Sequence, residues 1–123
     1  MQPNDIVVLI DRYCAAWNEP NALRRRELMA SVWAEAATYT DPNVHAAGVD
    51  ELLDHIARTV ARRPGAKVVR TSRIDVHHGV ARFGWRIVQA DGSMLPEGLD
   101  LVDITADGKI GRIVGFFGPL VSD

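Results

Sequence analysis

The sequence predicts an α+β domain in which three N-terminal helices cover one face of a strongly curved β-sheet. Apolar residues recur at helical spacing in the first half of the chain, and the period changes to two near residue 67. Turn sequences of the Asp-Gly type separate the later apolar runs. Helices followed by consecutive strands are typical of an α+β arrangement. A chain of 123 residues is long enough for one hydrophobic core, so we expect a single domain over residues 1–123.

Three amphipathic helices are predicted. The first starts at Pro3-Asn4-Asp5 and buries residues three or four apart, namely Ile6, Leu9, Ile10, Tyr13 and Trp17. Asn21 can cap a second helix over residues 22–33. A third helix follows Gly48 and ends in the Arg-Arg-Pro-Gly sequence at residues 62–65. The periodicity therefore places Tyr13 on the buried face of the first helix.

Strands make up the rest of the predicted domain. A short strand over residues 36–40 precedes Asp41, and longer strands are expected over residues 67–77, 81–88, 97–105 and 109–118. Glycines interrupt or end these strands at positions 84, 111, 115 and 118, so we expect bends or bulges. A strongly curved sheet capped by helices encloses a cone in which a small apolar ligand can bind.

Composition and charge exclude several classes of function. The formal net charge is -2, with basic and acidic residues interspersed, so the chain lacks the basic surface of a nucleic-acid-binding protein. The one cysteine, Cys14, cannot form an internal disulfide, which favours a reducing compartment. The apolar run from Ile6 to Ile10 is too short for an export signal or a membrane span. We therefore expect a cytoplasmic protein with no nucleic-acid or membrane partner.

Asp41 is the first candidate functional residue, because it stands where a short apolar strand meets Pro42. Proline cannot donate to a sheet ladder, and it favours extended geometry for the residue before it. We therefore expect Asp41 at a strand end, with its side chain directed by the backbone. The alternative is that Asp41 is an ordinary turn-forming residue.

A second acid lies in the predicted strand that contains residues 98–104. Alternation places Asp103 on one face with two leucines, and Asp100 on the other face with Val102 and Ile104. If the face with Asp103 lines the cone, burial favours a neutral carboxyl group that can donate a hydrogen bond to a substrate oxygen. The alternative is that a bulge turns Asp103 outward, or that a buried partner satisfies it.

Tyr13 is a second potential donor into the same cavity. A tyrosine on the inner face of an amphipathic helix is otherwise a core residue with a satisfied hydroxyl group. Together, Tyr13, Asp41 and Asp103 are the candidate catalytic residues, because three polar groups that converge on one dry pocket carry more weight than any of them alone.

Several short stretches carry a family resemblance: Asp11-Arg12-Tyr13, residues 37–42, Gly48, residues 99–103 and residues 107–110. They resemble steroid delta-isomerase and the SnoaL-like branch of the NTF2-like superfamily, and the resemblance runs from the first helix to Phe117. It implies an NTF2-like cone, with three N-terminal helices packed on a strongly curved antiparallel or mixed β-sheet. It also implies a homodimer, since this fold commonly pairs through its sheet.

The resemblance also implies roles for the candidate residues. Asp41 matches the general base that moves a proton between carbons, while Tyr13 and Asp103 match the two donors to the oxyanion. The predicted pocket wall is largely aromatic and aliphatic and comprises Trp17, Trp33, His55, Phe83, Trp85, Ile87, Leu99, Leu101, Ile113 and Phe117. Such a wall suits a small, flat, hydrophobic carbonyl compound as ligand or substrate.

Two departures from the family pattern bear on the chemistry. Trp33 and Ile56 stand where some steroid isomerases have supporting tyrosines, and neither can donate through a phenol. His55 is a titratable group that a steroid pocket does not require. It is either exposed or satisfied on its helix, or it points inward. An inward His55 would favour dehydratase-like or cyclase-like acid/base chemistry.

No metal site and no cofactor are predicted. His77 and His78 are adjacent in a turn and are expected to point to opposite faces, and no other His, Cys or carboxylate stands at ligand spacing. The sequence has no Gly-rich phosphate loop and no Ser or Cys nucleophile motif. Any chemistry is therefore expected to be cofactor-free acid/base chemistry.

Three functions remain open from the sequence. The first is an isomerase-like proton shift by Asp41. The second is a related cyclase, dehydratase or epoxide hydrolase. The hydrolase needs an inward arginine between two acids, and Arg82, Arg86 and Arg112 are expected to face outward, whereas Arg73 is not excluded. The third is a non-catalytic ligand-binding or dimerisation module, in which the acids are solvated or paired away from the cavity.

Overall fold

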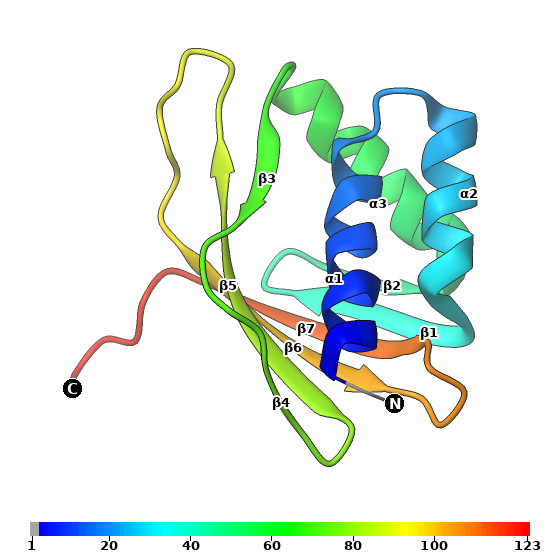
Figure 1. Ribbon diagram of the computed structural model, residues 1–123. Helices are drawn as coiled ribbons and strands as arrows, with labels where there is room; N and C mark the ends of the chain where they lie inside the picture. Colours follow the sequence, from blue (N-terminus) through cyan, green and yellow to red (C-terminus); the bar gives the residue numbers. More distant parts are fainter. Residues whose placement is uncertain (1–2) are drawn as a thin grey trace.

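The computed structural model describes residues 3–123, which form three helices and seven strands. The helices are α1 (Pro3–Asn18), α2 (Ala22–Val32) and α3 (Gly48–Arg62). The strands are β1 (Trp33–Asp41), β2 (Val44–Ala47), β3 (Lys67–Arg70), β4 (Asp75–His77), β5 (Val80–Val88), β6 (Gly98–Ile104) and β7 (Ile110–Phe117). Figure 1 shows the three helices gathered on one side of a strongly bent sheet. The predicted α+β fold class is confirmed.

The sheet is mixed, with the strand order β2-β1-β7-β6-β5-β3, and β4 pairs with β5 beside β3. The pair β1 and β7 is parallel, and the other pairs are antiparallel. This order places the end of β1 beside β7, and β6 between β7 and β5. Residues far apart in the sequence are thereby brought to one concave face.

The segment before α3 is more regular than predicted. Residues 44–47, expected as a loop, form β2 and pair antiparallel with β1, with Asp41 opposite Val44. Pro42 and Asn43 form the two-residue turn between them, and the Asn43 amide donates to Asp41 Oδ1 at 2.8 Å. This side-chain bond to the backbone two residues on stabilises the turn. Asp41 is therefore a turn-forming residue as well as the last residue of β1.

The strand predicted over residues 67–77 is divided into β3 and β4, which pair with different halves of β5. The division occurs opposite Gly84, whose ideal Cβ would lie 2.6 Å from Thr71 Oγ1. The Gly84 amide donates to Ser72 Oγ at 2.7 Å, and the Thr71 amide donates to the Gly84 carbonyl at 2.9 Å. Because Gly84 has no side chain, residues 71 and 72 can lie close to β5, and the edge strand bends there and divides into β3 and β4.

The helices cover the concave face and leave the opposite face of the sheet open. Side chains of α1 and α3 that are buried include Ile10, Tyr13, Leu52 and Ile56. Asn18 at the end of α1 bonds to both the amide and the carbonyl group of Val68, at 2.7 and 2.8 Å. This pair of bonds attaches the helix to the β3 edge. The end of α1 is therefore held against β3, at one edge of the concave face.

Two sequence predictions concern the chain as a whole. Within residues 3–123, none of the helices has the length and apolar character needed to cross a membrane. The single domain predicted over residues 1–123 includes residues 1 and 2, which lie outside the described part of the chain. The extent of the domain remains a prediction.

Candidate active site

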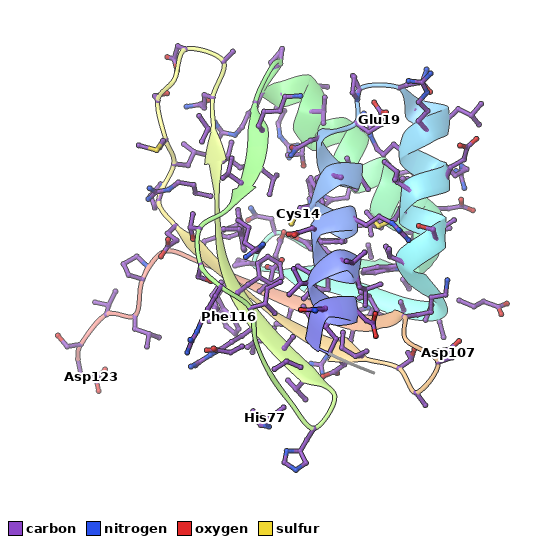
Figure 2. The ribbon with its side chains drawn as sticks, in the orientation of Figure 1. Cys14, Glu19, His77, Asp107, Phe116 and Asp123 are labelled. Atoms are coloured by element: carbon purple, nitrogen blue, oxygen red, sulfur yellow. The ribbon has the colours of Figure 1, made fainter. Side chains whose placement is uncertain are left out.

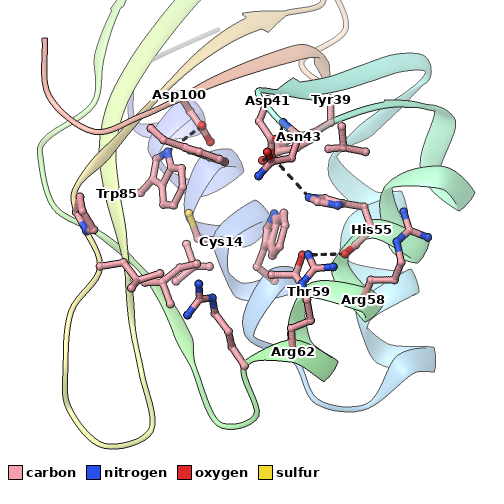
Figure 3. Close-up of a pocket in the computed structure, with 18 of the residues that line it drawn as sticks. Cys14, Tyr39, Asp41, Asn43, His55, Arg58, Thr59, Arg62, Trp85 and Asp100 are labelled. Carbon is pink, nitrogen blue, oxygen red and sulfur yellow. Dashed lines mark hydrogen bonds and ion pairs between the residues drawn. The ribbon is translucent and has the colours of Figure 1, made fainter. Parts of the chain in front are cut away.

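A pocket of about 860 Å³ occupies the concave side of the sheet. Its lining comes from α1, α3, six strands and the loops between them, and Figure 3 shows the side chains that surround it. The lining residues are Tyr13, Cys14, Trp17, Tyr39, Asp41, Asn43, Val44, His55, Arg58, Thr59, Arg62, Arg63, Val68, Phe83, Trp85, Ile87, Leu95, Pro96, Asp100, Phe117 and Gly118. A concave, mostly apolar pocket with a few convergent polar groups is the usual form of a small-molecule site.

Asp41 enters the pocket from the end of β1, and its side chain is only 4% exposed. Its Oδ2 accepts a hydrogen bond from the Tyr39 hydroxyl at 2.8 Å and lies 3.7 Å from His55 Nε2. Burial by itself raises the pKa of Asp41, but His55, the Asn43 amide and the Tyr39 hydroxyl outweigh it and hold that pKa below its ordinary value. Asp41 is therefore the ionised carboxylate of the pocket.

His55 points inward from α3, an orientation that the sequence left open. Its ring lies edge-on to Trp17 at 5.7 Å and tilted against Tyr39 at 5.6 Å, so aromatic rings hold it beside Asp41. Figure 3 shows the contact between His55 and Asp41 across the pocket. A histidine next to a carboxylate can accept a proton from it and pass that proton on.

Asp100 is the second acid of the pocket, and its environment is opposite to that of Asp41. It is 4% exposed, and its Oδ1 accepts one hydrogen bond from Trp85 Nε1 at 2.9 Å. Burial raises the pKa of Asp100 to about 7, the Trp85 bond opposes the rise, and the nearby charge of Asp41 adds to it. Near neutral pH and below it, much of Asp100 is a neutral carboxylic acid that can donate a hydrogen bond.

The expectation that Asp103 lines the pocket is wrong. Its side chain is 53% exposed and lies 3.9 Å from Arg112 Nη1 on the outer face of the sheet. Asp103 pairs across β6 and β7 with Arg112, whereas Asp100 pairs with Gly115. Because directly paired residues share a face, the face of Asp100 is the concave one.

Two glycines make room for the buried acid. An ideal Cβ on Gly115 would lie 2.9 Å from Asp100 Oδ1 and 3.5 Å from Asp41 Cβ, and one on Gly98 would lie 2.5 Å from the Trp85 ring. Gly98 is paired with Trp85, so the indole lies directly over it. Any larger residue at either position would displace part of the Trp85–Asp100 pair.

Tyr13 faces the pocket from α1 and stacks on Trp33 at a ring separation of 6.1 Å. Burial, followed by the charges of Asp100 and Tyr39, raises the pKa of its hydroxyl well above the ordinary value. Burial likewise raises the pKa of the neighbouring Cys14 thiol to about 12. Tyr13 is therefore a neutral donor, and Cys14 a neutral part of the wall instead of a nucleophile.

The apolar wall is partly as expected. Residues Trp17, Phe83, Trp85, Ile87 and Phe117 line the pocket together with His55. Four predicted wall residues do not line it. Trp33 and Ile113 are buried in the core, and Leu99 and Leu101 share the outer face with Asp103. The leucines were assigned to the wall together with Asp103, so one error of strand parity accounts for all three residues.

The sequence reasoning missed several polar lining residues. Tyr39 lies two residues before Asp41 on one strand and so shares its face, which is a signal present in the sequence. Arg58, Thr59 and Arg62 lie three, four and seven residues after His55, the spacing of one helix face. Because they share a helix face with His55, an inward His55 places these three residues along the pocket wall as well.

The prediction that His77 and His78 point to opposite faces is wrong. His78 has a φ of 48°, a left-handed conformation that turns its ring back, so the two Nδ1 atoms are 3.2 Å apart. Figure 2 labels His77 at the far end of the β4–β5 hairpin, remote from the pocket. Within residues 3–123, no group of three His, Cys, Asp or Glu residues is placed to hold a metal ion.

Comparison with known proteins places this architecture in a family. A solved SnoaL-like family protein from Agrobacterium tumefaciens, described as a candidate isomerase, has a TM-score of 0.88 and 32% sequence identity. That match covers 94% of this chain and 99% of the other. A candidate polyketide cyclase from Sinorhizobium meliloti has a TM-score of 0.72 and 16% identity, with 94% of this chain and 99% of that chain covered.

An NTF2-like protein of unknown function from Exiguobacterium is also similar, with a TM-score of 0.72 and 18% identity, over 91% of this chain and 99% of that chain. No protein-family profile matches the sequence, and no curated protein sequence matches it. The fold is that of an NTF2-like domain. At 32% identity over nearly its full length, the chain belongs to the SnoaL-like family of the NTF2-like superfamily.

Proposed function

We propose that this protein is a cofactor-free acid/base enzyme that moves a proton next to a carbonyl group of a small hydrophobic substrate. The observation that carries the proposal is the pair of carboxyl groups in one apolar pocket, with the pKa of Asp41 lowered and that of Asp100 raised to about 7. Environments that push two acids in opposite directions are characteristic of sites with one base and one acid.

In the proposed reaction, Asp41 removes a proton from the carbon beside the carbonyl group. The electron pair of the broken C–H bond forms a double bond to the carbonyl carbon, and the π pair of the carbonyl group moves to its oxygen, which becomes an enolate oxygen. Neutral Asp100 and Tyr13, both buried, donate hydrogen bonds to that oxygen from the pocket wall, where such bonds are strong. In a substrate with a carbon–carbon double bond next to the deprotonated carbon, the enolate is a conjugated dienolate. Asp41 then returns its proton to the far end of that double bond, and the carbonyl group reforms with the double bond shifted into conjugation.

Asp100 takes the role that the family resemblance assigned to Asp103. Tyr39 is a positioning residue in this scheme, because its hydroxyl bonds Asp41 Oδ2 and fixes the carboxylate in the pocket. The other oxygen is held by the Asn43 amide, so rotation of the base is restricted at both ends. A base fixed in this way is suited to proton transfer between two nearby carbons.

A cyclase or dehydratase is the second candidate, and the inward His55 favours it. With its Nε2 3.7 Å from Asp41, His55 can take the proton from Asp41 and deliver it to a leaving hydroxyl group. Both candidates begin with the same enolate. They differ in whether His55 is required, so His55→Gln should abolish loss of water from a β-hydroxy ketone while sparing proton exchange.

Two other possibilities receive less support. The Arg73 side chain is 91% exposed and pairs with Asp75, so Arg73 is not the inward arginine between two acids that an epoxide hydrolase site needs. A module without catalysis predicts acids that are solvated or paired away from the cavity. Asp41 and Asp100 instead line the pocket in nearly complete burial.

The test is deuterium exchange at the carbon beside the carbonyl group of 3-oxo-Δ5-steroids and smaller enolisable ketones, followed by NMR. We expect exchange that falls as the pH rises through about 7, where Asp100 loses its proton. Asp41→Asn should lower the rate at least about a hundredfold. Asp103→Asn is the matched control and should change nothing, because Asp103 lies on the outer face. Exchange that is absent with every ketone, or unaffected by Asp41→Asn, would contradict the proposal.

We also propose that the protein is a homodimer that pairs through the outer face of the sheet. Apolar side chains lie there on adjacent strands, with exposed Leu101 opposite half-buried Val114 and half-buried Leu99 opposite exposed Phe116. Arg82, Asp103 and Arg112 border these residues with both signs of charge. An apolar centre with a mixed polar rim is typical of an interface between copies of one chain.

A further inference from the structure

The mouth of the pocket carries positive charge that the proposed reaction does not use. Arg58, Arg62 and Arg63, all from the end of α3 and its C-cap, line the pocket together with the catalytic groups. The chain as a whole has a formal net charge of -2, so a general excess of basic residues does not explain this concentration. The cations are gathered at one place on the pocket wall.

Their position along α3 sets them apart from the acids. His55 contacts Asp41, and Arg58 and Arg62 follow it by one and two helical turns. At 1.5 Å per residue, Arg62 lies about 10 Å beyond His55 along the helix axis. Figure 3 shows Arg62 on the opposite side of the pocket from Asp100. A ligand that reaches both ends would place its reacting carbon and its charged group about that far apart.

Two of the three guanidinium groups have no hydrogen-bond or ion-pair partner among residues 3–123. Arg63 Nη1 donates to Gln89 Oε1 at 2.9 Å and is held at the rim. Arg58 and Arg62 form no side-chain hydrogen bond or ion pair with the described residues, whereas Arg26, Arg70 and Arg82 each pair with an aspartate. Asp41 does not pair with these arginines either, because its two carboxylate oxygens accept hydrogen bonds from the Tyr39 hydroxyl group and the Asn43 amide.

The helix dipole does not account for this arrangement. Basic residues are favoured in the last turn of a helix, whichever side they face. Here they continue the face of His55 and Thr59, which looks into the pocket. Guanidinium groups that border an apolar cavity without a partner are suited to bind a carboxylate from a ligand.

We propose that the substrate is an anionic amphiphile: a hydrophobic carbonyl compound whose far end carries a carboxylate bound by Arg58 and Arg62. Arg58 and Arg62 are exposed residues at the border of the pocket, so a carboxylate bound there keeps part of its water while the apolar body of the ligand lies in the pocket. The planar guanidinium group matches a carboxylate in shape. The inference rests on the proposed function for the position of the reacting carbonyl group, whereas the anion site rests on the arginines alone.

The test compares the binding of 6-hydroxy-2-naphthoate with that of its methyl ester by calorimetry. Both are flat and apolar and carry a hydroxyl group that imitates the enolate oxygen, and only the first has a negative charge at its far end. We expect the wild type to bind the carboxylate about tenfold more tightly than the ester, and added salt to reduce the difference. Arg58→Gln/Arg62→Gln should reduce the preference to about twofold or less.

Arg24→Gln is the control, since Arg24 is exposed on α2 and does not line the pocket. It should keep the full preference for the carboxylate. Equal binding of the two ligands, a preference that survives Arg58→Gln/Arg62→Gln, or failure to bind either ligand would overturn the inference. Because no turnover is measured, the two proposals can fail separately. If the protein prefers the carboxylate but catalyses no proton exchange, only the proposed function is contradicted. If it catalyses exchange on neutral ketones but shows no preference for the carboxylate, only the anion site is contradicted.

Discussion

At the scale of single residues, the site depends on two aspartates with the same chemistry and different surroundings. Asp41 is held by the Tyr39 hydroxyl and the Asn43 amide and faces His55, all of which favour its charged form. Asp100 has one hydrogen bond, from Trp85, and is otherwise buried near another acid. The proposed division of labour between base and acid follows from these contacts.

The raised pKa of Asp100 gives the stability of the fold a definite pH dependence. Below about pH 4 the Asp100 carboxyl group is protonated in both the folded and the unfolded chain, so its burial does not make the free energy of unfolding depend on pH. From there to about pH 7 the folded state holds a proton that the unfolded state has lost, and the free energy of unfolding falls as the pH rises. A shift from 3.8 to about 7 corresponds to roughly 4 kcal/mol at most.

Asp100→Asn should remove this dependence while keeping the acceptor for Trp85. We expect the free energy of unfolding of the variant, minus that of the wild type, to rise by up to about 4 kcal/mol between pH 4 and pH 8. Urea denaturation at both pH values measures it. Asp103→Asn is the control, and a difference for Asp100→Asn that does not change with pH would refute the assignment.

The sequence led to Asp41 because Pro42 marks the strand end, and to Tyr13 because helical spacing is regular. It did not lead to Asp100, because both faces of β6 carry apolar residues and alternation alone cannot tell them apart. A usable signal was present in the next strand. An Asp107-Gly108 turn places Ile113 opposite Val102 and Arg112 opposite Asp103, so an inward Ile113 implies an inward Val102 and, on the same face, Asp100.

At the scale of secondary-structure elements, β7 shapes the site as much as the strands that carry the acids. It pairs with β1 on one side and β6 on the other, so Gly115 lies between Asp41 and Asp100. The absence of a side chain there leaves space for both carboxyl groups. Gly115 carries no reactive group itself, yet it determines how closely the two carboxyl groups approach each other.

Gly115→Ala should damage the site without unfolding the protein. The new methyl group would lie 2.9 Å from Asp100 Oδ1 and would move the carboxyl group away from Trp85. We expect proton exchange to fall about tenfold or more, because a misplaced acid loses its alignment with the substrate oxygen. Gly111→Ala is the matched control on the same strand, since its methyl group would lie 3.0 Å from the Thr105 methyl group and at ordinary contact distance, 3.6 Å, from the Asp103 carbonyl oxygen. Equal rates in the two variants would contradict this role for Gly115.

Most elements could be predicted from periodicity, and the departures have local causes. The division of residues 67–77 into β3 and β4 depends on the close crossing at Gly84, which requires knowledge of the β5 partner strand. The strand β2 was read as a loop because four residues are too few to show a period. The direction of His55 depended on the rotation of α3, which is set by packing against β1 and β2.

At the scale of the whole molecule, one face of the sheet is concave and lines the pocket, and the other face is turned outward. The outer face has exposed apolar residues, including Val80 on β5, Leu101 on β6 and Phe116 on β7. This second apolar face explains why the alternation in β6 was ambiguous. It also gives the proposed homodimer a specific surface.

Phe116→Asp should convert the proposed dimer into a monomer. Phe116 is 52% exposed beside Leu99, and a charge there would be buried without a partner in an interface. Analytical ultracentrifugation at micromolar concentrations measures the mass. Leu23→Asp is the control, because Leu23 is exposed on α2, in the helical layer. A monomeric wild type, or a Phe116→Asp variant that remains a dimer, would argue against this interface.

In the proposed mechanism, one pocket holds an ionised and a protonated aspartate at the same pH. Carbon-13 NMR of the aspartate carboxyl groups between pH 3 and pH 9 tests it directly, with resonances assigned by Asp41→Asn and Asp100→Asn. The account predicts that Asp41 titrates below 3.8 and Asp100 near 7. Titration of Asp100 below pH 5, or of Asp41 above Asp100, would contradict it.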